Sequence, residues 1–139
     1  VFAGSWGIAS LESKLYVAKI SSTGQHNILW SKNHGGDYLN SAYSIQKTND
    51  GGYILAGVKD FNVMSVMPFT ATSDAYILKL NSIGNKVWER AYGMGEFSAA
   101  FSIQKTNDGG YIVGGTTRES SDELGNAYVL KLDQLGQIN

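Results

Sequence analysis

Residues 44–54 read SIQKTNDGGYI, and residues 102–112 read the same eleven letters 58 positions later. When the window is widened to 42–57 against 100–115, 13 of 16 positions still match. An identity of this length is not chance, so the chain contains an internal repeat. A period of about 50 to 60 residues is typical of propeller blades and similar arrays.

A third copy of the repeat is visible in a second motif. The segments LYVAKI (15–20), AYILKL (75–80) and AYVLKL (127–132) align, and each is followed four residues on by a glycine. The opening letters VFAG match ILAG at 54–57, so the first copy starts at its second strand. We therefore expect three parts, namely a partial repeat over 1–36, a complete repeat over 37–94 and a partial repeat over 95–139.

Composition sets the broad class of protein. The chain has 139 residues, of which 42% are hydrophobic, and this suits one soluble domain with a core. Its 11 basic and 12 acidic residues show no basic cluster, which argues against nucleic-acid binding. It has no cysteine, and no apolar run approaches the length of a membrane span. No signal sequence precedes Val1, so any leader lies outside this sequence.

The complete repeat predicts four antiparallel strands. Residues 42–48 alternate with period two, Asn-Asp-Gly-Gly at 49–52 suits a hairpin turn, and 53–58 run back as an apolar strand. A second hairpin joins 75–80 to 86–92, whose charged residues suggest an outer strand. Counted over the three copies, the pattern predicts three, four and three strands. Helix is not expected, because glycine interrupts every segment and no long apolar pattern of period 3.6 occurs.

The predicted fold is all-β, and a β-propeller-like array of about two and a half four-stranded blades is the first choice. Strands that are apolar on both sides must be covered on both sides, as in blades packed face to face. A stacked β-solenoid is the alternative, although it lacks two hairpins per unit. A ring needs at least about four blades, so we expect either a fragment of a longer chain or an oligomer that covers the open sheet faces.

The repeat resembles a known family of sequences. SIQKTNDGGYIVGGTT, followed by NAYVLKLDQLG, with KVWERAYG in the complete copy, is similar to the DGGY-type propeller repeat of bacterial and archaeal secreted or surface proteins. AYILKLNSIGNKVW is also similar to quinoprotein-type propeller repeats. The resemblance implies a propeller fold and an extracellular or cell-surface setting. It implies no catalysis, because the cysteines and the carboxylate cluster that hold a quinone in that group are absent.

The connections of a meander predict where ligands bind. Turns at 49–52, 107–110, 82–85 and 134–137 are short and nearly invariant, whereas the connections at the opposite end vary in length and chemistry. Variable loops on a rigid scaffold are common binding surfaces. The loop expected at 59–74 is rich in apolar residues, which either pack over a blade or offer a contact surface. The candidate ligand-binding residues on this variable-loop face are Trp6, Asp37, Tyr38, Phe61, Met64, Met67, Phe69, Glu96, Phe97 and Arg118.

Catalytic and metal-binding patterns are weak. His34 with Asp37 could bind a metal ion or act as a pair of groups that includes a catalytic base. Acidic residues at 96, 119, 122 and 123 are possible glycosidase carboxylates. We interpret both sets as solvated loop residues. Gly93 and Gly95 lack the third glycine and the helix of a phosphate loop. We predict no catalytic residue, no metal site and no cofactor. The recurring Trp30 and Trp88 are expected to pack between repeats, and the recurring lysines 19, 79 and 131 are expected to snorkel at strand ends.

Two functions follow as hypotheses. The first is a noncatalytic segment of a secreted or surface protein, which acts as a scaffold or as a module that binds a protein or a glycan. Its partners would be that ligand together with the remaining blades of a longer chain or other copies. The second is part of a glycan-active or quinone-dependent propeller enzyme whose catalytic residues lie outside this chain.

Overall fold

Every element of the computed structural model is a β-strand, and the predicted all-β class is therefore confirmed. The structure describes residues 2–6, 14–22, 27–35, 38–64, 70–119 and 124–139. The strands are β1 (Phe2–Trp6), β2 (Lys14–Ile20), β3 (Ile28–His34), β4 (Leu39–Lys47), β5 (Tyr53–Met64), β6 (Thr70–Leu80), β7 (Lys86–Tyr92), β8 (Phe97–Lys105), β9 (Tyr111–Arg118) and β10 (Asn126–Leu132).

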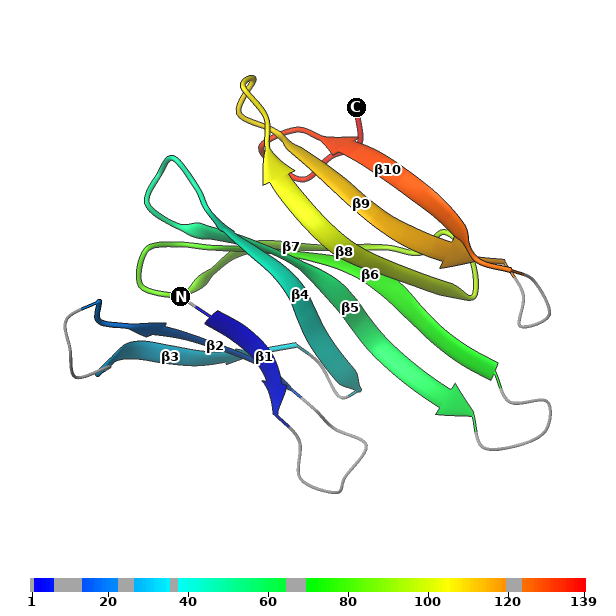
Figure 1. The fold of residues 1–139 in the computed structure, drawn as a ribbon, viewed down its shortest axis with the longest axis horizontal. Coiled ribbons are helices and arrows are strands. Elements are labelled where there is room, and N and C mark those ends of the chain that lie inside the picture. Colours follow the sequence, from blue (N-terminus) through cyan, green and yellow to red (C-terminus); the bar gives the residue numbers. More distant parts are fainter. Residues whose placement is uncertain (1, 7–13, 23–26, 36–37, 65–69, 120–123) are drawn as a thin grey trace.

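The strands form three successive antiparallel meanders, which we call units 1, 2 and 3 (Figure 1). Unit 1 is the sheet β1-β2-β3, unit 2 contains β4 to β7, and unit 3 contains β8 to β10. Units 2 and 3 share one hydrogen-bonded sheet only through a single parallel pair, Ser73 with Phe97. The predicted division into three, four and three strands is confirmed. In the described part of the chain neither sheet closes into a barrel.

The repeated Asn-Asp-Gly-Gly turn joins the first two strands of units 2 and 3. Gly51 and Gly109 have φ angles of 80° and 83°, a conformation that side chains rarely adopt. The next glycine, Gly52, lies against the backbone of β6, and a Cβ there would overlap the carbonyl oxygen of Leu80. Gly110 has the same relation to Leu132. Each glycine of the pair therefore has a different role, the first in turning the chain and the second in allowing close approach.

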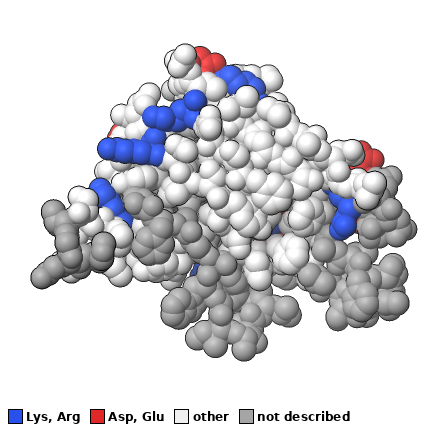
Figure 2. Space-filling model, viewed as in Figure 1, with Lys and Arg blue, Asp and Glu red and all other residues white. Residues whose placement is uncertain are grey.

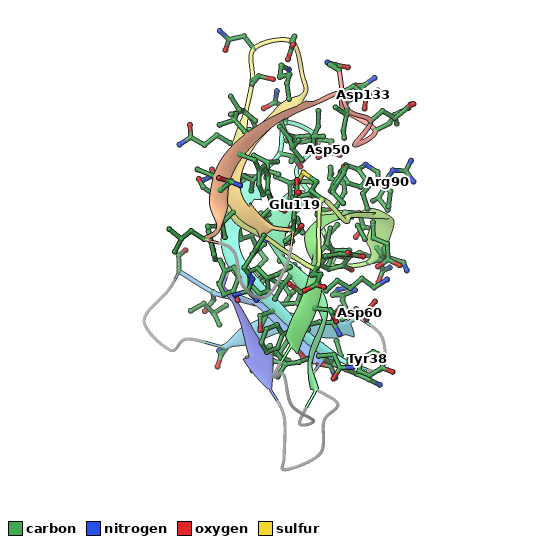
Figure 3. The ribbon with its side chains drawn as sticks, turned by 90° about the vertical axis from the view of Figure 1, so that its right-hand side faces the viewer. Tyr38, Asp50, Asp60, Arg90, Glu119 and Asp133 are labelled. Carbon is green, nitrogen blue, oxygen red and sulfur yellow. The ribbon has the colours of Figure 1, made fainter. Side chains whose placement is uncertain are left out.

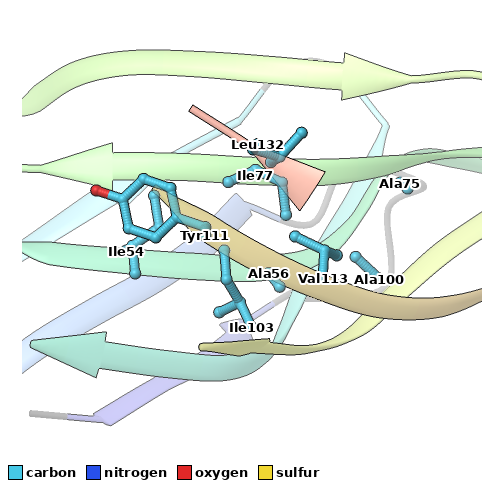
Figure 4. Close-up of a cluster of buried hydrophobic side chains, with 9 residues drawn as sticks. All are labelled: Ile54, Ala56, Ala75, Ile77, Ala100, Ile103, Tyr111, Val113 and Leu132. Carbon is cyan, nitrogen blue, oxygen red and sulfur yellow. The ribbon is translucent and has the colours of Figure 1, made fainter. Parts of the chain in front are cut away.

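The core lies between the units. The second and third strands of unit 2 are buried on both faces, as their apolar sequences predict. One face packs on unit 1 in a cluster that includes Leu15, Val17, Leu55 and Leu78. The other face packs on unit 3, and Figure 4 shows that cluster, which contains Ile54, Ala56, Ala75, Ile77, Ala100, Ile103, Tyr111, Val113 and Leu132. Unit 2 is thus the middle layer.

The expected loop at 59–74 is largely strand, which corrects that prediction. β5 continues to Met64 and β6 begins at Thr70, with pairing from Asn62–Thr72 to Met64–Thr70. The pairing passes a register shift after Lys59, and Asp60 adopts a φ angle of 55° beside it. A bulge of this kind lets a strand continue beyond a local break in the alternating pattern. Residues 65–69 lie outside the described residues.

Candidate functional site

The two ends of unit 2 differ as the meander predicts. In the side view, Asp50 and Asp133 lie toward one end, in tight turns, whereas Tyr38 and Asp60 lie toward the other end, beside the longer connections (Figure 3). We call the first the tight-turn end and the second the variable-loop end. Each end carries its own cluster of side chains.

At the tight-turn end, Asp50 is the centre of a hydrogen-bonded turn. Its Oδ1 accepts from the Thr48 hydroxyl at 2.5 Å and from the Gly52 amide at 3.0 Å, and its Oδ2 accepts from Lys79 Nζ at 2.7 Å. The hydrogen bond from the Lys79 ammonium, followed by that from Thr48, holds the pKa of Asp50 well below its usual range. The carboxylate therefore stays ionised and has a structural role.

The same turn recurs in unit 3. Asp108 accepts from the Thr106 hydroxyl, the Gly110 amide and Lys131 Nζ, and the lysine is the main cause that lowers the pKa of Asp108. The prediction that these lysines snorkel is wrong for Lys79, which is only 5% exposed and also donates to the Leu80 carbonyl. It folds back onto the turn of its own unit because a carboxylate there satisfies its charge.

The two recurring tryptophans pack between units, and that prediction is confirmed. Trp30 of unit 1 lies edge-on to Tyr53 of unit 2, with ring centroids 5.8 Å apart, and its ring covers Gly84. Its indole N–H donates to the Ser82 carbonyl at 3.2 Å. In the second interface Trp88 meets Tyr111 at 6.3 Å and covers Gly136 in the same way. Both interfaces therefore use one set of contacts.

Each interface leaves a groove at the tight-turn end. The groove between units 2 and 3 has a volume of about 460 Å³, and that between units 1 and 2 has about 350 Å³. The lining of both grooves includes the ends of the first strands, which places the grooves at the tight-turn end. The larger groove is lined by Thr48, Asn49, Asp50, Lys79, Val87, Trp88, Lys105, Thr106, Gly109, Tyr111, Gln134 and Leu135, and the smaller by Lys19, Ile20, Ile45, Gln46, Lys47 and Tyr53.

Sequence reasoning missed these grooves, since it placed binding at the variable end. A signal was nevertheless present. The lysine that ends the first strand, Lys47 or Lys105, is as invariant between the copies as the turn beside it. An exposed residue that is kept in an internal repeat marks a position that the repeat uses.

At the variable-loop end the structure brings together three of the predicted residues. Phe61 of β5 meets Phe97 of β8 edge-on, with centroids 6.2 Å apart, and the Arg118 guanidinium of β9 lies 5.7 Å from the Phe97 centroid. The rings and the cation form a row across units 2 and 3, of the kind that a planar or anionic group can contact. Their role in ligand binding stays a prediction.

Of the remaining predicted residues, the structure describes the side chains of only Tyr38 and Glu96. Tyr38 and Glu96 are exposed, and the Glu96 carbonyl accepts from the Ser73 amide at 3.1 Å. Trp6 ends β1 and Met64 ends β5, with side chains that are not described. Asp37, Met67 and Phe69 lie outside the described residues.

The described members of the possible metal and catalytic sets are His34, Glu96 and Glu119. His34 is half-buried at the end of β3, and burial lowers its pKa, so the neutral imidazole is favoured at neutral pH. Among the residues that the structure describes, no three His, Asp or Glu side chains come close enough together to hold a metal ion. Glu119 is exposed, while residues 122 and 123 lie outside the described part.

Comparison with known proteins adds no assignment. No protein-family model matches the chain, and no curated protein is significantly similar to it.

Proposed function

We propose that the chain is a noncatalytic, β-propeller-like repeat segment that acts as a scaffold and binding module of a secreted or surface protein. The observation that carries this proposal is that equivalent residues of units 2 and 3 touch along their first strands. Tyr43 and Phe101 hold equivalent positions, and their ring centroids lie 5.3 Å apart. Units related by rotation about an axis bring equivalent atoms together only near that axis, which is where a propeller has its first strands.

Further contacts support the same arrangement. The Ile103 amide of β8 donates to Ser44 Oγ of β4 at 3.4 Å, and Lys105 Nζ donates to Asn49 Oδ1 at 3.0 Å. Both join neighbouring positions of the repeat in successive units. The outer strands β3 and β7 instead reach the next unit through the tryptophans described above.

The outer face of unit 3 indicates how such an array continues. Ile112 and Val129 are exposed there, and a Cβ at Gly114 between them would meet no atom within 4 Å. The equivalent face of unit 2 carries Ile54 and Ala56 and is buried by unit 3. An uncovered apolar sheet face favours packing on a further unit, supplied by a longer chain or by another copy.

The noncatalytic role is supported by carboxylates that are engaged in ion pairs and hydrogen bonds within the fold. At the tight-turn end Asp50 and Asp108 are held by lysines, and Glu89 accepts from Tyr76 and Lys86. The Phe61, Phe97 and Arg118 row offers a contact surface at the opposite end. The extracellular setting rests on the resemblance to DGGY-type repeats. Among the described residues no helix is long and apolar enough to cross a membrane.

The scaffold is tested by light scattering together with far-UV circular dichroism. We expect a β-rich protein that self-associates through the outer face of unit 3, and Val129→Glu should reduce its mass without changing the spectrum. Val87→Glu is the matched control, because Val87 is an equally apolar exposed residue on the outer strand β7. If the unmodified protein and both variants all have the mass of a monomer, the outer face of unit 3 has no role in self-association.

The binding role is tested with arrays of purified glycans and extracellular proteins. A ligand of the variable-loop end should lose affinity in Arg118→Ala and keep it in Arg90→Ala, an exposed arginine on β7. Equal loss in both variants would show that the Phe61, Phe97 and Arg118 row is not the contact surface.

A further inference from the structure

The two grooves at the tight-turn end share three equivalent residues of the repeat. Each contains the lysine of the third strand of the repeat, which is β2 in unit 1 and β6 in unit 2, a lysine that ends the first strand of the next unit, and the tyrosine that begins the strand after it. The shared residues are Lys79, Lys105 and Tyr111 in the larger groove and Lys19, Lys47 and Tyr53 in the smaller one. A site built from the repeat recurs wherever two units meet.

The lining of the larger groove contains both polar and apolar residues. The two turns contribute Thr48, Asn49 and Thr106, with hydroxyl and amide groups. The apolar part of the lining contains Trp88 with Val87 and Leu135, which remain more than half exposed at 57% and 53%. Its volume of about 460 Å³ lies within the range of about 300–1,000 Å³ that is usual for ligand pockets. Such a groove can contact the apolar C–H face of a sugar ring and its hydroxyl groups at once.

The grooves carry a net positive charge although the whole chain carries −1. The larger groove has Lys79, Lys105 and Asp50, which gives +2 − 1 = +1, and the smaller has Lys19 and Lys47, which gives +2. Within the described residues, neither Lys47 nor Lys105 forms an ion pair. Figure 2 shows basic side chains gathered at the upper left, over the ends of β4 and β8.

We propose that these grooves bind an acidic polysaccharide, with a sugar residue in each groove and its carboxylate on the lysine that ends the first strand. This proposal rests on the noncatalytic binding function proposed above and gives that function a second surface and a ligand class. A polysaccharide is favoured over an acidic peptide because both grooves contain a lysine that ends a first strand together with the tyrosine that begins the next strand. A polymer of identical residues can place the same carboxylate on each of these lysines in succession, whereas a peptide presents a different side chain at each.

The test uses an oligogalacturonate of defined length as the probe and titration calorimetry at low salt. The fully methyl-esterified oligomer keeps the rings and removes the charge, so it is the matched ligand control. Lys105→Gln and Lys47→Gln should each weaken binding by about five- to tenfold, because each removes one charge-assisted contact. The double variant should lose about the product of the two losses, because the two lysines lie in separate grooves and contribute independently.

Lys14→Gln is the protein control, because Lys14 is an exposed lysine at the start of β2, away from the grooves. Urea midpoints equal to that of the unmodified protein show that the variants are folded. The inference is overturned if the oligogalacturonate does not bind or if its methyl ester binds with equal affinity. It is also overturned if Lys14→Gln weakens binding as much as the groove variants do. Equal binding of polyglutamate would overturn it in favour of an acidic peptide. A ligand that depends on Arg118 in the array experiment would leave the binding function standing if the oligogalacturonate fails.

Discussion

Asp50 and Asp108 sit in identical sequences, yet their lysine partners differ in environment. The side chain of Lys79 is 6% exposed, whereas that of Lys131 is 34% exposed, although both pair at 2.7 Å. The difference arises because unit 3 covers the face of unit 2 that carries Lys79, while the equivalent face of unit 3 is open. Packing by the neighbouring unit therefore determines how much the free energy of unfolding depends on the carboxylate that pairs with the lysine.

The Asp50–Lys79 pair predicts an asymmetric response to substitution. Asp50→Asn leaves a buried ammonium without its counter-charge and should lower the free energy of unfolding by about 2 kcal/mol. Lys79→Met leaves a carboxylate whose side chain is 61% exposed, and this solvation limits the cost to about 1 kcal/mol or less. Urea unfolding at neutral pH measures both values. A larger loss in Lys79→Met would contradict the assignment of the buried partner.

The same pair predicts a dependence on pH. Because the pKa of Asp50 is lower in the folded than in the unfolded chain, its contribution is complete above the unfolded pKa of about 4 and falls as the pH drops toward the folded pKa. The difference in unfolding free energy between the unmodified protein and Asp50→Asn should therefore be smaller at pH 3 than at pH 7. A difference that stays constant between these pH values would show that the carboxylate does not titrate in this way.

At the scale of the element, the first strands of units 2 and 3 carry the same irregularity. The pairing shifts by one residue between Ala42 and Ser44 and again between Ala100 and Ser102, which leaves Tyr43 and Phe101 as the extra residues. Such a bulge re-aims the extra side chain. Both aromatic residues are about half exposed and their rings meet each other, so the two bulged positions form a contact between successive first strands.

Two neighbouring glycines test the packing behind this bulge. A Cβ at Gly115 would overlap the carbonyl oxygen of Ala99, whereas one at Gly114 would meet nothing within 4 Å. Gly115→Ala should therefore cost about 2–4 kcal/mol of unfolding free energy. Gly114→Ala should change it by less than about 1 kcal/mol, and in the stabilising direction, because alanine restricts the unfolded chain. Thermal or urea unfolding of the pair gives the comparison, and equal losses would contradict the described geometry.

At the scale of the whole molecule, the three units follow one another in chain order, and unit 2 packs on both neighbours. The tryptophan contacts are confined to one interface each, Trp30 to the first and Trp88 to the second. In an array of this kind, stability divides into terms for each unit and for each interface between neighbours. Loss of one interface should therefore loosen the terminal unit beyond it more than the rest.

Hydrogen exchange of the two tryptophan variants measures this division. Trp88→Ala should increase exchange in β8 to β10 by more than in β2 and β3, and Trp30→Ala should do the reverse. Each substitution should lower the global unfolding free energy by about 2–4 kcal/mol, because a large side chain is removed from a packed interface. Each variant serves as the control for the other. Uniform acceleration in all strands would show that the units unfold as one block.

The sequence by itself determined the elements that depend on neighbouring residues. Period-two alternation and the Asn-Asp-Gly-Gly turns predicted the hairpins, and the repeat predicted three, four and three strands. The continuation of β5 to Met64 was missed, because pairing with β6 outweighs the local break at Asp60. Local patterns carry no information about such a partner.

Only the tertiary structure decided which distant side chains meet. Lys79 reaches Asp50 across 29 positions, and the grooves exist only where two units lie side by side. Of the predicted ligand-binding residues, the structure joins Phe61, Phe97 and Arg118, from three strands of two units. The physical reason is that local sequence sets the conformation of each strand, whereas the distances between strands follow from burying apolar faces against one another.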